Sequence, residues 1–332
     1  MLNDQFYIGK DDASYPKNIS VIIHQRNKMS NIIFGPIHSR RFGKSLGVDL
    51  SPGKKQCNFD CLYCELAPAQ TMDTYSNVVS VAEIASAIKT ALREHKDIDF
   101  ITLTANGEPT LYPYLSELID EINTFKGSTK TLILTNAANI DDDKIQEALL
   151  KLDEVKLSLD CASQKCLEKL DRSHGGIAVE NIKEGMLAFK SKYDKPLIIE
   201  ILIVKTLNDS DEEIEKLNAF LLKLKPTRID ISSIDRPPAY AVQALNYEEL
   251  LRLSHLFDAS LPVYIASRKK AEITASSYSD EEILDTLDKR PLTAEDIEAL
   301  FDEHSQNRVQ NLLRKEKIKR VLTNGVEFYK KA

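Results

Sequence analysis

The strongest constraint on the fold is a repeated alternation of strand-like and helical segments. Six runs rich in aliphatic residues recur with helical runs between them, which predicts a parallel sheet built from β-α-β units. Such crossovers share one hand, and the sheet either stays open or curls into a barrel with ligands at the carboxyl ends of its strands. We therefore expect functional residues just after strands. The predicted strands span 46–50, 98–104, 130–135, 155–159, 197–204 and 228–233.

Local signals mark the helices between these strands. Ser80 and Glu83 are spaced as a capping box, and the apolar residues that follow repeat with a helical period. The segment 210–224 shows a similar spacing. These crossovers predict an α/β fold.

Composition excludes several classes of protein. The 332 residues are 42% hydrophobic and 29% charged, with a net charge of −7, which suits a folded chain of about two domains and excludes a disordered one. The longest uncharged apolar run is shorter than a membrane span, and residues 1–28 lack the pattern of a signal peptide. We expect a cytoplasmic protein without membrane contact. Met29 is expected to be the natural start, with 1–28 as an extension.

The C-terminal segment has a different pattern. Residues 281–332 read as three short amphipathic helices followed by a hairpin, with Thr293 and Asp296 capping the second helix and Asn324-Gly325 forming the turn. Helix, helix, helix, hairpin is the winged-helix pattern. The predicted units are therefore an extension at 1–28, a main domain at 29–280 and a winged helix at 281–332.

Charge is divided within the predicted winged helix. Residues 281–303 carry nine acids and two bases, whereas 304–332 carry two acids and eight bases. A basic helix and wing suit an anionic partner such as nucleic acid, although such a surface also occurs as a solvated face or binds protein. The basic residues concerned are Arg308, Arg314, Lys315, Lys317, Lys319 and Arg320.

Three of the five cysteines carry the densest chemical signal. Cys57, Cys61 and Cys64 fall within eight residues directly after the first predicted strand. Zinc normally needs a fourth protein ligand, and no second cysteine pair follows at the usual distance. An iron–sulfur cube held by three thiolates keeps one iron available for an exchangeable ligand. Cys161 and Cys166 suggest no second site, and we expect them to be buried and reduced.

The C-x3-C-x2-C spacing, with Tyr63 before the last cysteine, resembles the radical S-adenosylmethionine (SAM) superfamily. That resemblance implies a [4Fe–4S] cluster on Cys57, Cys61 and Cys64, with SAM on the fourth iron. It also implies that SAM is contacted after the second, third and fourth strands. The residues matching those positions are Asn106, Gly107, Glu108, Asn136, Ser158 and Asp160, and Tyr63 joins them in the cofactor site. The superfamily's first glycine is replaced here by Asn106.

The resemblance extends over about residues 30–332. The run 35–47 and the segment Asp235-Arg236-Pro237-Pro238 are similar to a bacterial radical SAM family with a C-terminal winged helix, related to enzymes of wyosine synthesis in tRNA. The implied fold is a partial (β/α)6 barrel with that small domain. Arg40 or Arg41 would contact an anionic substrate or SAM, or else lie solvated on a strand. His174 would touch substrate or cap a helix.

The implied reaction begins when reduced flavodoxin or ferredoxin delivers an electron to the cluster. SAM is then cleaved to a 5′-deoxyadenosyl radical, which abstracts a hydrogen atom, and the barrel must shield that radical. RNA, tRNA above all, is the expected substrate, presented by the winged helix. Two alternatives remain: a maturase acting on a protein or metal cofactor, and a non-catalytic iron–sulfur sensor controlling a winged helix. No catalytic residue is assigned.

Overall fold

The computed structural model describes residues 32–39, 42–265, 275, 277–289, 291–323 and 326–332. An eight-stranded sheet runs in chain order from β1 to β8, with β1 antiparallel to β2 and all later neighbours parallel. Its strands are β1 (Ile33–Ser39), β2 (Gly43–Asp49), β3 (Phe100–Thr104), β4 (Lys130–Thr135), β5 (Glu154–Ser158), β6 (Leu197–Ile203), β7 (Arg228–Ser233) and β8 (Val263–Ile265).

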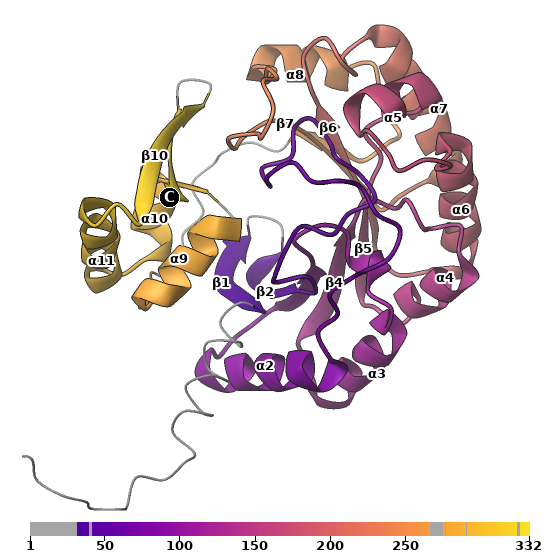
Figure 1. Cartoon of the computed structure of the whole chain (residues 1–332). Coiled ribbons are helices and arrows are strands. Elements are labelled where there is room, and N and C mark those ends of the chain that lie inside the picture. Colours follow the sequence, from indigo (N-terminus) through magenta and orange to yellow (C-terminus); the bar gives the residue numbers. More distant parts are fainter. Residues whose placement is uncertain (1–31, 40–41, 266–274, 276, 290, 324–325) are drawn as a thin grey trace, which may run out of the picture.

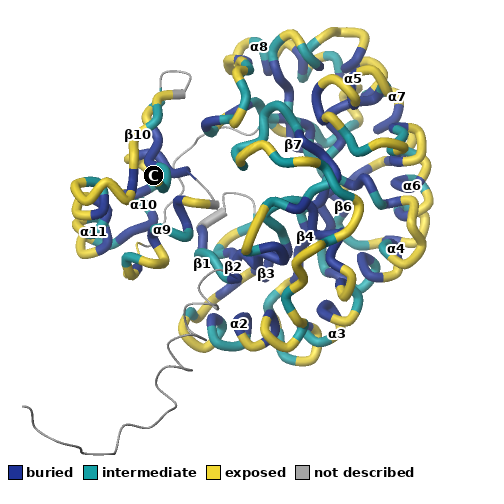
Figure 2. Tube along the Cα trace, in the orientation of Figure 1, coloured by how far each residue is buried: buried dark blue, intermediate teal, exposed yellow. Residues whose placement is uncertain are grey.

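Helices cover the outer face of this curved sheet (Figure 1). They are α2 (Val81–Glu94), α3 (Leu115–Phe125), α4 (Asp143–Leu149), α5 (Gln164–Leu170), α6 (Val179–Lys192), α7 (Asp211–Leu224) and α8 (Tyr247–Ser254), with the short 3-10 helix η1 (Pro109–Leu111). The predicted capping box of Ser80 and Glu83 begins α2. The strands are buried and the outward faces of the helices are exposed, so the main core lies between the two layers (Figure 2).

The six predicted strands are present as β2 to β7. The sheet also contains β1 and β8, which the sequence did not predict, so its described part has eight strands. β8 is only three residues long and Tyr264 at its centre is exposed, which leaves little apolar pattern to detect. Among the described residues, β1 and β8 are the two ends of the strand order.

A separate unit follows β8. It contains α9 (Asp280–Lys289), β9 (Leu292–Thr293), α10 (Ala294–Leu300), α11 (Glu303–Arg314), β10 (Ile318–Thr323) and β11 (Val326–Lys331). The three predicted helices and the two hairpin strands are confirmed, and β9 adds a third strand in the order β10-β11-β9. A hydrophobic core of its own, which includes Tyr278 and Phe301, holds this C-terminal unit together.

Some expectations fall outside the described residues. They concern the extension 1–28 with Met29, the arginines Arg40 and Arg41, and the Asn324-Gly325 turn. Among the residues that are described, no helix is both long and apolar enough to cross a membrane.

The C-terminal unit is joined to the first strand by a buried hydrogen bond. The hydroxyl of Tyr278 donates to the carbonyl oxygen of Pro36 at 2.7 Å. Tyr278 also packs against Phe301, with ring centroids 4.7 Å apart and the ring planes tilted by 56°. This tyrosine therefore belongs to the core of the C-terminal unit and to its contact with β1.

The Tyr278→Phe substitution should keep the ring packing but leave the Pro36 carbonyl without its donor. We expect the free energy of unfolding to fall by about 1 kcal/mol. Thermal unfolding of the two proteins measures this. Unchanged stability would show that the carbonyl finds another donor and that the bond does not hold the units together.

Candidate functional site

The three sequence-predicted cysteines lie on one long loop between β2 and α2. Cys57, Cys61 and Cys64 are partly buried free thiols. Because β2 and β3 run parallel, this loop and the segment after β3 emerge at the same edge of the sheet. A short bridge joins them: the Gln56 N–H donates to the carbonyl of Asn106, and the Glu108 N–H donates to the carbonyl of Gln56, both at 2.9 Å.

Gly107 permits this close approach. Its φ is +136°, and a Cβ atom there would lie 1.9 Å from the carbonyl oxygen of Gln56. No side chain fits such a distance. The predicted turn of Asn106 and Gly107 thus serves first to bring the cysteine loop onto the end of β3.

Gln56 anchors the loop from within and was not predicted. Its side-chain nitrogen donates to the Ser51 hydroxyl and the Asn77 carbonyl at 2.8 and 2.9 Å. Its side-chain oxygen accepts from the Ser76 and Asn77 N–H groups. One buried amide therefore holds both ends of the cysteine loop together, and no sequence motif marks it.

Glu108 is almost fully buried and ties together the ends of β3 and β4. One carboxylate oxygen accepts from the N–H and hydroxyl of Thr110, at 2.9 and 2.7 Å, and from the Thr135 hydroxyl. The other accepts from the Asn136 N–H at 2.8 Å. Burial raises its pKa, although these donors oppose the shift. The carboxylate shapes the site, and its contact with SAM stays a prediction.

Asn136 is placed against the cysteine loop, as the prediction of a shared site requires. Its side-chain nitrogen donates to the Asn58 side chain at 2.7 Å and lies 3.8 Å from the sulfur of Cys57. Asn136, Ser158, Asp160 and Tyr63 line one small cavity. Four of the predicted cofactor residues are thus brought together beside the cysteines.

Asp160 and Tyr63 form a buried link between the cysteine loop and the sheet. The Tyr63 hydroxyl donates to Asp160, whose second oxygen accepts from the Leu202 N–H at 2.7 Å. Burial raises the pKa of Asp160 to about 7 and also raises that of neighbouring Asp171. Tyr63 and Asp160 thus make hydrogen bonds within the protein, and the contact of each with SAM remains a prediction.

The cysteines are chemically suited to a cationic centre. Burial raises the pKa of Cys57 to about 12, and burial likewise raises the pKa values of Cys61 and Cys64. Bound iron would offset this desolvation by stabilising the thiolates, and its binding would release protons. The three thiols stand on one loop, so each could bind its own iron of a cluster.

A second loop grips the cysteine loop near Cys64. The Ala239 N–H donates to the Cys64 carbonyl at 2.8 Å. The Arg236 guanidinium contacts both oxygens of Glu65 at 3.0 and 3.1 Å. Burial lowers the pKa of Arg236, but Glu65 and Asp235 outweigh that effect and raise it overall. The Asp-Arg-Pro-Pro segment is therefore structural support for the residue after Cys64.

The C-terminal unit reaches the same place. The Lys330 ammonium donates to the Glu65 carbonyl at 3.4 Å, and the charge of Asp296 adds to the raised pKa of Arg236. The C-terminal unit, which carries the basic residues of 304–332, therefore contacts the cysteine loop of the main domain.

His174 also contacts the cysteine loop. Its N–H donates to the Asn58 carbonyl at 2.7 Å, and its ring nitrogen lies 3.1 Å from the Thr71 hydroxyl. His174 therefore holds the cysteine loop. The N-cap of the following helix α6 is Ala178, not His174.

One sequence expectation is wrong. Cys161 and Cys166 were expected to be reduced, but a disulfide joins them. Cys161 ends the segment after β5 and Cys166 lies in the first turn of α5, which brings the two sulfurs together. Sequence spacing alone cannot show that these side chains face each other.

The Arg236→Gln substitution should loosen the cysteine loop. In the partly buried ion pair that Arg236 forms, one guanidinium nitrogen donates to both oxygens of Glu65, and loss of the pair is expected to speed backbone hydrogen exchange at residues 57–66 about fivefold. Arg252→Gln, which breaks the exposed pair with Asp211, is the matched control and should leave that loop unchanged. Equal exchange in all three proteins would contradict a supporting role for Arg236.

Comparison with known proteins gives the site its context. The Radical SAM superfamily pattern matches residues 54–221, which include the cysteine loop. The UPF0026 protein of Helicobacter pylori is 40% identical over 302 residues, covering 90% of this chain and 97% of that protein. A radical SAM methyltransferase from Sphaerobacter thermophilus has a similar fold, with a TM-score of 0.53 and 15% identity, covering 68% of this chain and 67% of that one.

A further solved structure is Streptococcus suis SuiB bound to S-adenosylmethionine. It is 20% identical, with a TM-score of 0.51, and covers 64% of this chain and 49% of that one. Enzymes of the superfamily use a [4Fe–4S] cluster and SAM, and the buried three-cysteine loop fits the cluster. The chain therefore belongs to the radical SAM superfamily, as an enzyme whose relatives include the UPF0026 proteins.

Proposed function

We propose that this enzyme cleaves SAM reductively and uses the resulting radical to take a hydrogen atom from RNA bound by its C-terminal unit. The observation that carries the first part is the set of three free thiols on one buried loop, beside Asn136 and Ser158 at the carboxyl edge of the sheet. When bound, the cluster and SAM supply a 5′-deoxyadenosyl radical. Reduced flavodoxin or ferredoxin is the proposed electron source, which implies the cytoplasm.

The chain's own residues position and enclose the reacting groups. Cys57, Cys61 and Cys64 would hold the cluster. Asn136 and Ser158 lie where polar contacts to SAM are expected, and the Gln56 and Glu108 networks keep the loop and strand ends in register. Holding the reacting groups in fixed positions would limit side reactions of a radical.

The C-terminal unit supports the choice of RNA. Its order of α9, β9, α10, α11, β10 and β11 agrees with a winged helix. An exposed basic strip runs from the end of α11 onto β10 and consists of Arg314, Lys315, Lys317, Lys319 and Arg320. Arg308 on α11 pairs with Asp280 at 3.2 Å, and within the strip Arg320 pairs with Glu327 at 3.6 Å. A basic surface on an acidic protein attracts a phosphate backbone locally.

Reconstituted protein with dithionite and SAM should release 5′-deoxyadenosine under anaerobic conditions. Replacing Cys57, Cys61 or Cys64 by Ala should abolish release, because each removes one thiolate from the cluster. Chromatography quantifies the product. A cluster that assembles without any SAM cleavage would instead favour the iron–sulfur sensor.

Binding of tRNA should weaken steeply with salt, because cations on the protein displace counterions from the phosphates. Charge reversal at Lys315, Lys317 and Arg320 should reduce affinity by about tenfold or more. The matched control reverses Lys96, Lys144 and Lys223, which are exposed elsewhere, and changes the net charge equally. Fluorescence anisotropy measures both variants. Equal weakening by both, or no salt dependence, would remove RNA and leave a protein or metal-cofactor substrate.

A further inference from the structure

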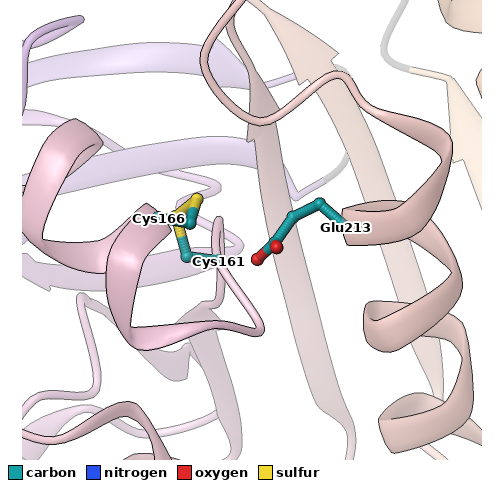
Figure 3. Close-up of side chains that lie close together, drawn as sticks. All are labelled: Cys161, Cys166 and Glu213. Carbon is teal, nitrogen blue, oxygen red and sulfur yellow. A yellow bond between two sulfur atoms is a disulfide. The ribbon is translucent and has the colours of Figure 1, made fainter.

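The disulfide between Cys161 and Cys166 lies at a junction of three elements (Figure 3). Cys161 lies three residues after the end of β5, next to Asp160, and Cys166 lies in the first turn of α5. The two Cα atoms are 5.5 Å apart, which is an ordinary distance for such a bond. Both cysteines are buried, with 1% and 7% of their surfaces exposed.

This bond is unexpected in the surroundings that the enzyme needs. A cluster that must be reduced to act requires a strongly reducing compartment. Protein disulfides in such compartments are mostly catalytic or redox-sensing rather than permanent cross-links. A cysteine pair already in bonding contact should therefore exchange between dithiol and disulfide.

The contacts of Glu213, at the start of α7, distinguish a redox pair from a metal site. One of its oxygens lies within 4.8 Å of both sulfurs, so the three side chains are close enough to share an ion. However, its carboxylate already accepts from the Ala162 N–H at 2.7 Å, the Ser163 N–H at 2.9 Å and the Ser163 hydroxyl at 2.8 Å. Glu213 therefore holds residues 162 and 163 in place, and the two sulfurs bond to each other.

The other end of α5 contacts the cluster loop directly. The carbonyl of Leu170 accepts from the Leu62 N–H at 2.9 Å, and the carbonyl of Asp171 accepts from the Asp60 N–H at 3.0 Å. These two bonds flank Cys61. Because α5 has only seven residues, it is marginal on its own and depends on its anchors. The disulfide is one anchor, and the ligand loop is held at the opposite end.

We propose that Cys161 and Cys166 are a reversible redox site whose oxidised form slows loss of the cluster. One thiolate attacks a low-molecular-weight disulfide such as glutathione disulfide, forming a mixed disulfide and releasing one thiol. The second cysteine then attacks the mixed disulfide and releases the second thiol. Two electrons and two protons pass from the pair to the small disulfide. The closed bond ties α5 to the end of β5, and α5 holds the backbone on both sides of Cys61.

Small reagents reach the pair through local opening of α5. The outward face of this helix, with Gln164, Lys165, Glu168 and Lys169, is exposed. Short exposed elements open more often than the core of a domain. The site therefore needs no permanent channel.

The test uses the full chain with its cluster, equilibrated anaerobically at a series of ratios of glutathione to glutathione disulfide. Free thiols are alkylated, and tryptic peptides are analysed by mass spectrometry. Cleavage after Lys165 separates the two cysteines, so a linked peptide pair reports the disulfide. Iron release to a chelator is then timed at both ends of the series. We expect reversible titration of the pair, and iron release on the order of tenfold slower from the oxidised form.

Two variants control the interpretation. The double variant Cys161→Ala/Cys166→Ala should release iron at one rate at every ratio. Ser163→Ala weakens the cap of α5 without touching sulfur, so it should speed release in both forms and preserve their difference. A pair that never changes state overturns the proposal, as does equal iron release from both forms. Zinc retained by the reduced wild type and lost in the double variant also overturns it, in favour of a metal site.

Discussion

The contact between Gln56 and Gly107 is the constraint on which the site depends. It joins the cysteine loop to the end of β3, and it exists only because residue 107 has no side chain. Further hydrogen bonds connect the neighbouring strand ends. Glu108 accepts from Thr135 and Asn136 at the end of β4, and the side-chain nitrogen of Asn136 lies near the sulfur of Cys57. The loop that carries the cysteines is irregular, yet hydrogen bonds join it to the segment after β3, to the end of α5 and to two other loops.

The cysteine loop is also held by two further groups of contacts. In the first, α5 and His174 bond to its backbone around Asn58, Asp60 and Leu62. In the second, Arg236 and Ala239 hold Glu65 and Cys64. Lys330 of the C-terminal unit also donates to the carbonyl of Glu65, the residue after the third cysteine. A catalytic cluster needs such positioning, because small displacements of reacting groups slow a reaction strongly.

Much of this arrangement could be predicted from the sequence. Buried parallel strands consist of continuous apolar runs, so β2 to β7 were detectable, and the cysteine spacing located the site. β8 was missed because three residues with an exposed tyrosine give no pattern. Gln56 was missed because a buried amide has no signature outside its contacts. The disulfide was missed for a related reason, since the meeting of Cys161 and Cys166 depends on how α5 packs.

The central claim is that three protein thiolates hold the cluster and leave one iron for SAM. Electron paramagnetic resonance of the reduced full-chain enzyme, recorded before and after SAM is added, tests it most directly. The account predicts that SAM changes the spectrum of the cluster, because SAM binds an iron that no cysteine occupies. A spectrum that SAM leaves unchanged would contradict it.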